Sequence, residues 1–290
     1  PAYRAAKEVA PNVPTVAAKT GLPESDIAEF YGLWGRTRKV VTVYSQGVNQ
    51  SAHGSDKVNA IINCHLATGR IGQPGMGPFS ITGQPNAMGG REVGGLANQL
   101  AAHMDFAPED VERVQRFWQA PAIAHSPGLK AVDLFKAVAD GKIKALWIMG
   151  TNPVVSLPDA DAARAALQRC PLVVVSDAVA DTDTVRLAYI KLPALTWGEK
   201  DGTVTNSERR ISRQRSFLPP PGEAKPDWWA VTQVARRLGF ADRFPFESPA
   251  AVFREHAALS GFENEGRRDF DISAFAELAD ADYETLQPVQ

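Results

Sequence analysis

Cysteine is scarce in this sequence, since only Cys64 and Cys170 occur among 290 residues. Two cysteines so far apart build no disulfide framework and do not have the spacing of a metal-ligand set. This scarcity is typical of proteins in a reducing compartment. We therefore expect a cytoplasmic location and no metal ligands within this chain.

The sequence also lacks an excess of either charge. Its 31 lysines and arginines nearly balance its 33 aspartates and glutamates, which leaves a net charge of -2. This balance gives no electrostatic reason to expect nucleic acid or an anionic membrane as a partner. No apolar run is long enough to span a bilayer, and the first residues lack the pattern of a secretory signal. Because the first residue is proline, we expect an internal piece of a longer protein.

What the sequence does contain is a repeated order of strand, polar loop and helix. The β-branched run KVVTVY predicts a strand, which the polar loop SQGVNQSAHG and a helix from Ser55 follow. Residues 142–193 predict two buried strands, ALWIMG and LVVVSD, with the helix AARAALQR between them and a short third strand after them. We therefore expect an α/β fold with doubly wound, mostly parallel sheets in two related α/β units.

Covering helices are expected elsewhere. Apolar spacing predicts helices at residues 3–10 and 24–35, two more within residues 100–140, and one after a proline-rich connection that begins near residue 217. The final forty residues show no clear period. This arrangement leaves the loops after the parallel strands as the places to look for a binding site.

Ligands bind open α/β sheets at the carboxyl ends of the strands. Asp177 ends the strand LVVVSD, where a carboxylate could accept hydrogen bonds from a ribose diol or from the paired N–H groups of a guanine edge. The alternative is that Asp177 only caps the next helix. Asn152 lies in the turn GTNP before a proline, where its amide could meet phosphate, although such a turn can equally be structural.

The stretch GPFSITGQPNAMGGREVGG, residues 77–95, has no helical or strand period. It is too rich in apolar residues for a flexible linker, so we predict an ordered irregular loop, and ordered loops of this length are usually functional. Cys64 and His65 stand together in a predicted helix. We interpret the cysteine as a small buried hydrophobe rather than a metal ligand.

Six motifs occur together in a fixed order: GVNQ, HLATGRIGQPGMGPFSITGQPNAMGGREVGGLA, WIMGTNPVVSLPDA, VVVSDA, LPALTWGEKDGTVTNSERR and PGEAKPDWW. This set, within residues 30–235, resembles the molybdopterin oxidoreductases of the dimethyl sulfoxide reductase type. The resemblance is strongest to the catalytic subunits of assimilatory nitrate reductases. Formate dehydrogenases of the same superfamily share the GTNPVVSLPD pattern but usually differ in the glycine-rich segment.

The resemblance implies two molybdopterin guanine dinucleotides around one molybdenum. It assigns cofactor-binding positions to Gln46, Gln50, Gln84, Asn152, Ser176, Asp177, Lys200 and Asp227. The Ser176–Asp177 pair would recognise a guanine, which agrees with the independent argument from the strand end. The molybdenum-ligating residue would lie outside this sequence.

The resemblance also gives the glycine-rich segment a role, because it places Arg91 and Glu92 close to molybdenum as catalytic residues. Nitrate is a planar anion that a guanidinium fork can match with two hydrogen bonds. Glycines would let the backbone approach the pterins. The alternative is that Arg91 only forms an ion pair with a neighbouring domain.

With this resemblance we expect residues 1–99 to belong to a first cofactor-binding domain and residues 100–240 to form a second, dinucleotide-type one. Residues 241–290 would lead to a further domain. A [4Fe-4S] cluster is expected in the full-length protein with ligands outside this segment, so the segment alone is expected to be inactive. The expected partners are nitrate and an electron donor, either ferredoxin, flavodoxin or an NADH-linked subunit.

Three other readings stay open at this point. The chain could belong to a formate dehydrogenase or a periplasmic-type nitrate reductase. It could be a non-catalytic scaffold of the same fold, although its polar cofactor positions are filled. A thiamine diphosphate domain would explain GTNP and VVVSD but would leave the glycine-rich segment unexplained.

Overall fold

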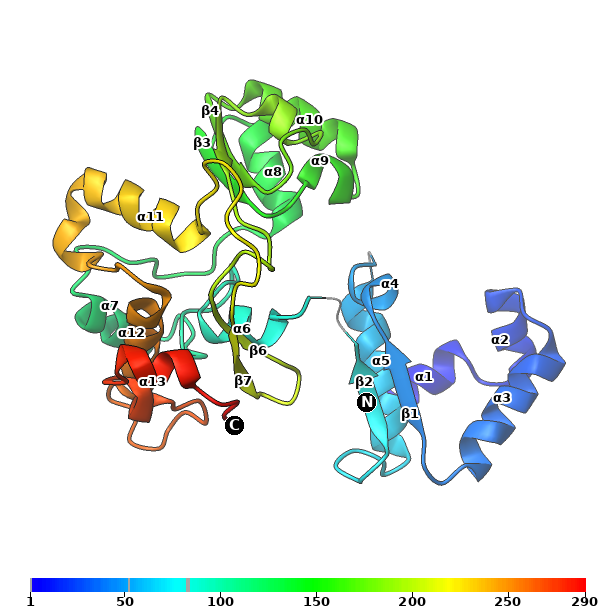
Figure 1. Cartoon of the computed structure of the whole chain (residues 1–290). Helices are drawn as coiled ribbons and strands as arrows, with labels where there is room; N and C mark the ends of the chain where they lie inside the picture. The colour runs from blue at the N-terminus through cyan, green and yellow to red at the C-terminus, as the bar shows by residue number, and fades with distance from the viewer. Residues whose placement is uncertain (1, 52, 82–83) are drawn as a thin grey trace. The chain divides into compact units, whose positions relative to one another are not determined.

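The computed structural model describes residues 2–51, 53–81 and 84–290. The chain folds into two compact units, residues 1–84 (unit 1) and residues 85–290 (unit 2), each with its own elements (Figure 1). The predicted boundary between residues 99 and 100 concerns the cofactor-binding domains, and it stays a prediction. No helix within the described ranges is long and apolar enough to cross a membrane.

Unit 1 opens with three helices, α1 (Ala2–Val9), α2 (Val13–Thr20) and α3 (Glu24–Arg36). The helices predicted at residues 3–10 and 24–35 correspond to α1 and α3. The side chain of Asn12 begins α2, because its Oδ1 accepts a hydrogen bond from the backbone N–H of Thr15 at 2.9 Å. Gly21 ends this helix with a φ of 72°, a conformation that glycine adopts without strain.

A two-stranded parallel sheet follows, made of β1 (Val41–Tyr44) and β2 (Gly77–Ser80). Two helices, α4 (Gln46–Asn49) and α5 (Gly54–Ala67), form the crossover between the strands (Figure 1). The predicted strand and the predicted second helix are therefore confirmed in this unit, whereas the predicted polar loop contains the short helix α4. Polar residues that follow β1 contact residues at and after the end of β2, at the carboxyl ends where open α/β sheets bind ligands, and we refer to such a strand-end group as the crevice of its unit.

The glycine-rich segment 77–95 is not irregular throughout, and in this respect the sequence-based prediction was wrong. β2 takes its first four residues and α6 (Ala87–Glu92) its second half, while residues 82–83 lie outside the described part. β2 has no local period because β1 orders it, and the backbone N–H of Gly77 donates to the carbonyl of Val40 at 3.0 Å. Two adjacent glycines conceal the helical pattern of α6.

Unit 2 contains a three-stranded parallel sheet in the order β3-β4-β5. Its strands are β3 (Ala145–Met149), β4 (Leu172–Asp177) and β5 (Ile190–Pro193), and its helices are α8 (Ala131–Ala139), α9 (Pro153–Ser156) and α10 (Ala160–Arg169). Val173 and Val175 of β4 pack with Val138 of α8 and Leu167 of α10 in one fully buried cluster. Each such buried side chain contributes about 1.5–3 kcal/mol of burial free energy. The predicted parallel sheet with covering helices is confirmed.

The rest of unit 2 contains an antiparallel hairpin. The hairpin strands are β6 (Gly202–Thr205) and β7 (Ile211–Gln214), and further helices of the unit are α7 (Pro108–Trp118), α11 (Asp227–Ala235), α12 (Pro249–Gly261) and α13 (Asp280–Thr285). A second cluster includes Met104, Val114, Phe253 and Tyr283, all buried. The sequence pattern indicated neither the hairpin nor the helices of the final forty residues.

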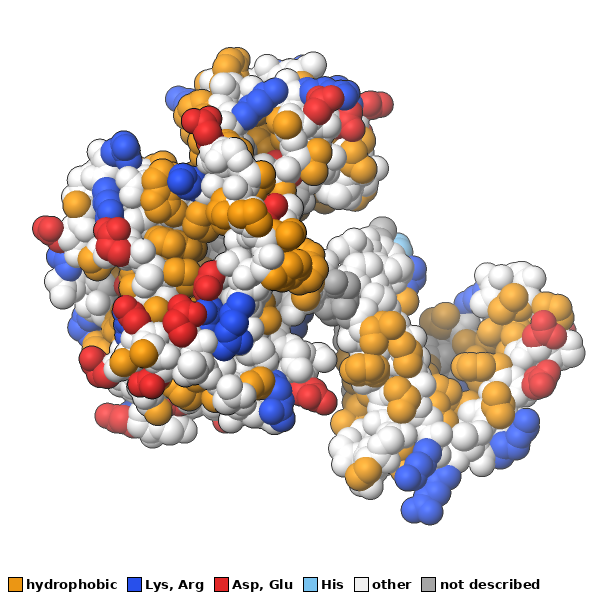
Figure 2. Space-filling model, in the orientation of Figure 1, with side chains coloured by type: hydrophobic (Ala, Val, Ile, Leu, Met, Phe, Trp, Pro, Cys, Tyr) orange, Lys and Arg blue, Asp and Glu red, His pale blue; other side chains and the backbone are white. Residues whose placement is uncertain are grey.

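Hydrophobic side chains stay exposed on unit 1, where orange patches are visible on the part drawn at the right of Figure 2. Val43 of β1 and Phe79 of β2 are register partners on one face of the sheet, and they are 55% and 48% exposed. Val41 points to the same face and is 46% exposed. This face of the two-stranded sheet is therefore not covered within unit 1.

Candidate functional site

The crevice of unit 1 is lined by amides and hydroxyls. At the end of β1, Ser45 Oγ donates to Gln46 Oε1 at 2.6 Å, and Gln46 Nε2 donates to Gln84 Oε1 at 3.0 Å. Asn49 Nδ2 donates to Ser80 Oγ, at the end of β2, at 3.1 Å. The structure thus brings together Gln46 and Gln84, two of the predicted cofactor-binding residues. This crevice offers hydrogen-bond donors and acceptors without a formal charge.

Gln50 ends α4, and its backbone N–H donates to the carbonyl of Gln46 at 2.8 Å. Its side chain is exposed directly after this short helix. Asn49 is a crevice residue that the sequence analysis missed. Its signal was its place within the loop SQGVNQ, directly after a predicted strand.

In unit 2, Asn152 follows β3 and is held by a neighbouring loop. Its Oδ1 accepts hydrogen bonds from Thr184 Oγ1 at 2.6 Å and from the backbone N–H of Thr184 at 3.3 Å. Thr184 is fully buried, and its Oγ1 in turn accepts from the backbone N–H of Val154 at 3.3 Å. The amide oxygen of Asn152 is therefore occupied by the fold, and its NH₂ group is the part that can serve a ligand.

Ser176 and Asp177 end β4 but face different surroundings. Ser176 is 2% exposed, and its Oγ accepts from the indole N–H of Trp147 at 2.8 Å. Asp177 is half-buried, and its Oδ1 accepts from the backbone N–H of Val179 at 3.0 Å, which makes a tight turn. No helix of the described chain begins at this turn, so Asp177 shapes a loop and does not cap a helix.

Lys200 and Asp227 form an ion pair with 2.8 Å between Nζ and Oδ2. Their motifs are 27 residues apart in sequence, and the fold brings them together. Asp227 follows Pro226 and is the first residue of α11, where a carboxylate suits the positive end of the helix dipole. Both side chains are about a third exposed, so each can still contact a ligand.

The two predicted catalytic residues lie in the last turn of α6 and differ in exposure. Arg91 is exposed and forms no ion pair within the described residues. Glu92 is 2% exposed, and its Oε2 accepts from Thr205 Oγ1 at 2.7 Å. The backbone N–H of Thr205 also donates to Asn86 Oδ1 at 2.9 Å. Strand β6 therefore fixes both ends of α6, a role of Thr205 that the sequence analysis did not find.

A cavity of about 70 Å³ lies behind Glu92 and is also lined by Thr203 and His256. Burial, together with the nearby His103, lowers the pKa of His256 to about 4. The ring of Phe270 lies 5.4 Å from that of His256 and 5.5 Å from that of His103. His256 is consequently neutral at pH 7.

A larger cavity of about 740 Å³ in unit 2 is mainly apolar, with walls from Phe117, Trp118, Leu238 and Phe244. None of the predicted site residues lines it. Within it, burial raises the pKa of Glu255, whose Oε1 accepts from the indole N–H of Trp118 at 3.1 Å. Trp147 of β3, whose indole N–H donates to Ser176, also lines this cavity, so one of its walls belongs to the sheet that carries the candidate site.

Cys64 is exposed and not the buried hydrophobe that we expected, whereas His65 is fully buried. The Nε2 atom of His65 lies 2.8 Å from Thr42 Oγ1, and its ring packs against Trp34 at 5.0 Å. Burial and then the charge of Arg70 lower the pKa of His65. Across the described residues, no group of three histidine, cysteine or acidic side chains could hold a metal ion.

A family model described as molybdopterin oxidoreductase matches residues 10–237. The chain is 61% identical to a nitrate reductase of Klebsiella oxytoca over 95% of its length, and 52% identical to one of Shewanella frigidimarina over 98%. It covers 32% and 30% of these two proteins, so it spans about a third of the relatives that it matches.

A solved structure of similar fold is the acetylene hydratase from Pelobacter acetylenicus, with a TM-score of 0.61. The match covers 88% of this chain and 38% of that protein at 17% sequence identity. At this identity the likeness concerns the fold alone. It supports the mixed α/β architecture of parallel sheets and covering helices.

Proposed function

Because this chain belongs to the molybdopterin oxidoreductase family, we propose that it is the central part of a molybdenum-dependent nitrate reductase. The observation that carries this proposal is the 61% identity to the Klebsiella oxytoca nitrate reductase over nearly the whole chain. The proposed reaction takes one oxygen from nitrate and consumes two electrons and two protons, which yields nitrite and water.

The donor set of the crevices fits a molybdopterin guanine dinucleotide. The carboxylate of Asp177 can accept the paired N–H groups of a guanine edge, and the NH₂ group of Asn152 and the ammonium of Lys200 can donate to phosphate or pterin oxygens. Gly150 has a φ of 60° and no atom within 4 Å of the place that a Cβ would take, so the turn after β3 is open. When bound, the molybdenum–pterin group would supply the oxygen acceptor and the two electrons.

In unit 1 we propose that Gln46, Gln50 and Gln84 bind the second dinucleotide. Their amides both donate and accept, which suits the mixed polar edge of a pterin ring. Ser176 would contribute through its backbone, because its side chain is buried against Trp147. Asp227 would hold Lys200 in place and neutralise its charge until the ligand is bound.

We propose that Arg91 binds nitrate and that Glu92 positions it. The exposed guanidinium can hold a planar anion with two hydrogen bonds and offset its negative charge. The carboxylate of Glu92 anchors the last turn of α6 to β6 through Thr205, so the neighbouring Arg91 projects from a fixed backbone. Orientation of this kind is what a substrate-binding residue contributes to rate.

We further propose an assimilatory enzyme in the cytoplasm that takes electrons from ferredoxin, flavodoxin or an NADH-linked subunit. Residues 1–99 and 100–240 would each contribute one cofactor-binding domain, and residues 241–290 would connect the second to a further domain. An exposed Cys64 and a buried Cys170 cannot supply the four thiolates of a [4Fe-4S] cluster. Such a cluster would use ligands elsewhere in the full-length protein, and we derive no step through it.

The test is nitrate-dependent oxidation of reduced viologen by the full-length protein. We expect turnover in the wild type and about a tenfold or larger loss of kcat/KM in Arg91→Lys, because an ammonium cannot reproduce the bidentate contact. Arg38→Lys changes an exposed arginine of unit 1, whereas Arg91 belongs to unit 2, and this control should leave the rate unchanged. Oxidation of formate without reduction of nitrate, or a fully active Arg91→Lys variant, would contradict the proposal.

A further inference from the structure

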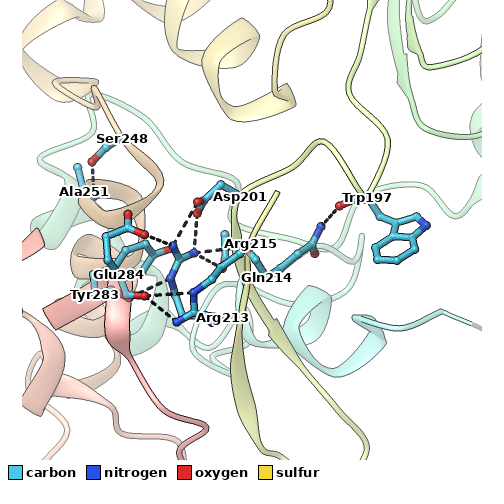
Figure 3. A network of polar contacts seen from close by, with 10 residues as sticks. Trp197, Asp201, Arg213, Gln214, Arg215, Ser248, Ala251, Tyr283 and Glu284 are labelled. Atoms are coloured by element: carbon cyan, nitrogen blue, oxygen red, sulfur yellow. Dashed lines mark hydrogen bonds and ion pairs between the residues drawn. The ribbon is translucent and has the colours of Figure 1, made fainter. Parts of the chain in front are cut away.

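Arg213 of β7 is buried and joins three segments of unit 2 (Figure 3). Its Nη1 and Nη2 atoms contact Oδ1 and Oδ2 of Asp201 at 2.5 and 3.2 Å, which is a bidentate ion pair. Its Nε donates to the carbonyl of Tyr283 at 2.9 Å, and Nη2 lies 3.1 Å from Oε2 of Glu284. The guanidinium carbon also lies 4.0 Å from the centre of the Tyr283 ring.

The ion pair of Arg213 and Asp201 affects a predicted cofactor-binding residue, because Asp201 directly follows Lys200. Asp201 stands between Lys200 and Gly202, the first residue of β6, and Nη1 of Arg213 also donates to the carbonyl of Gly202 at 2.8 Å. Lys200, the residue before Asp201, pairs with Asp227 of α11. Residues 200–202 are therefore held by two partners, Arg213 through Asp201 and Gly202, and Asp227 through Lys200.

The exposed fractions of the side chains indicate that Arg213 fixes Asp201 and not the reverse. The side chain of Arg213 is 0% exposed, whereas that of Asp201 is 33% exposed and that of Lys200 is 37% exposed. A buried guanidinium with a planar fork has little freedom to move, so it fixes the exposed carboxylate more than the carboxylate fixes it. The buried Arg213 thus fixes Asp201, and through the shared backbone it also fixes the more exposed Lys200.

We propose that Arg213 is a positioning residue that orients Lys200 for cofactor binding by fixing Asp201. This inference rests on the proposed function, because it takes Lys200 as a residue that binds the pterin dinucleotide. Arg213 touches no ligand itself. It sets the direction of the peptide that carries Lys200, and with it the place where the ammonium meets the cofactor.

A purely structural role for Arg213 would be to anchor α13 through Tyr283 and Glu284. Arg254 of α12 provides a matched control, because it anchors the same helix and, in the described part of the chain, none of its hydrogen bonds or ion pairs reaches residues 200–202. Its Nη1 donates to the carbonyl of Leu278 at 2.9 Å and contacts Asp280 Oδ1 at 2.7 Å. Loosening α13 through Arg254 therefore separates the two roles.

The experiment measures the pterin and guanine nucleotide that the purified full-length protein retains after dialysis. The variants are Arg213→Lys, Lys200→Met, the double variant and Arg254→Lys, with the melting temperature of each as a second readout. We expect about a fivefold loss of retained cofactor in Arg213→Lys and in Lys200→Met, and no further loss in the double variant. Arg254→Lys should retain the wild-type amount even if its melting temperature falls.

Losses that multiply in the double variant would overturn the proposal, as would full retention in Arg213→Lys or in Lys200→Met. If Arg213→Lys does not fold, Asp201→Asn replaces it, because it removes the charge of the pair at a partly exposed position. The readout does not depend on the reaction. A protein that retains the cofactor but does not reduce nitrate would refute the proposed function and leave the coupling between Arg213 and Lys200 measurable.

Discussion

The two crevices have the same origin at the carboxyl ends of parallel strands, but they hold their polar groups differently. In unit 1, the exposed amide of Gln84 and the half-buried amide of Gln46 bond to each other. In unit 2, Asn152 is bound by the fully buried Thr184, and Lys200 is paired with Asp227. The difference teaches that unit 2 forms its crevice before a ligand arrives, whereas unit 1 can exchange its mutual contacts for contacts with a ligand.

The largest predicted change is a loss of unfolding free energy at low pH, and we expect it to come mainly from unit 2, through His256. The pKa of His256 is about 4 in the folded state against 6.5 for the free side chain, so the folded state disfavours the proton. This contribution is complete above pH 6.5 and is lost as the pH falls from 6.5 to 4, by about 3 kcal/mol. Urea unfolding at pH 7.5 and pH 4 measures this loss.

The matched variant for this prediction is His256→Gln, which removes the titrating group of unit 2 and leaves His65 of unit 1 in place. The pKa of His65 is also lowered, so the variant should keep part of the acid sensitivity. Equal pH dependence in the wild type and the variant would show that His256 takes no part.

The next largest effect should come from the backbone behind the unit 1 crevice. A Cβ at Gly54 would stand 2.4 Å from the carbonyl oxygen of Asn49 and 2.9 Å from that of Val48. Gly54→Ala should therefore displace α4 and cost about 2 to 3 kcal/mol of unfolding free energy. Gly47 lies on α4 itself, and a Cβ there would meet no atom within 4 Å, so the melting temperature of Gly47→Ala should change little or rise slightly. Equal melting temperatures for the two variants would disprove the close approach.

A smaller effect is expected from the support of Asn152 in unit 2. Thr184→Val keeps the shape of the side chain but removes the hydroxyl that donates to Asn152 and accepts from Val154. The buried N–H of Val154 would lose its partner and the half-buried amide oxygen of Asn152 would keep only the backbone N–H of Thr184, so the free energy of unfolding should fall by about 1 to 2 kcal/mol. Thr20→Val removes an exposed hydroxyl in unit 1 and should cost less than about 0.5 kcal/mol in the same urea titration. A Thr184→Val variant as stable as Thr20→Val would mean that unit 2 does not preform its crevice.

The smallest effect should come from the amide pair of unit 1. Gln84→Ala removes the contact with Gln46, and because the Gln84 side chain is exposed, water replaces the lost partner. We expect a change of at most about 0.5 kcal/mol in thermal unfolding of the cofactor-free chain. A loss above 1 kcal/mol would show that this crevice is as rigid as that of unit 2.

The strands of unit 2 were predictable because Val173 and Val175 belong to a short apolar run between clear turn signals. Strand β2 could not be predicted in this way, because it is stabilised by pairing with β1, which lies more than thirty residues earlier in the sequence. α12 is a different case. Ser248 accepts a hydrogen bond from the backbone N–H of Ala251 at 3.2 Å and Pro249 follows it, and both start signals were present in the sequence.

The residues of the candidate site also fall into two groups, those that local sequence predicts and those that depend on tertiary contacts. Asn152 and Asp177 could be predicted because they directly follow strands, and a strand end is a local property of the sequence. Thr184 and Thr205 could not, because their contacts depend on where a distant loop or strand returns in the fold. The burial of Ser176 against Trp147 is likewise a tertiary contact that local pattern does not reveal.

The most direct test of the account is the guanine nucleotide and pterin content of the purified full-length protein, compared between wild type and Asp177→Asn. The asparagine oxygen can still accept from the backbone N–H of Val179, so the turn persists, but the charge that would bind a guanine edge is lost. The account predicts guanine-linked pterin in the wild type and a clear loss in the variant. Equal content in both proteins, or no pterin in the wild type, would contradict it.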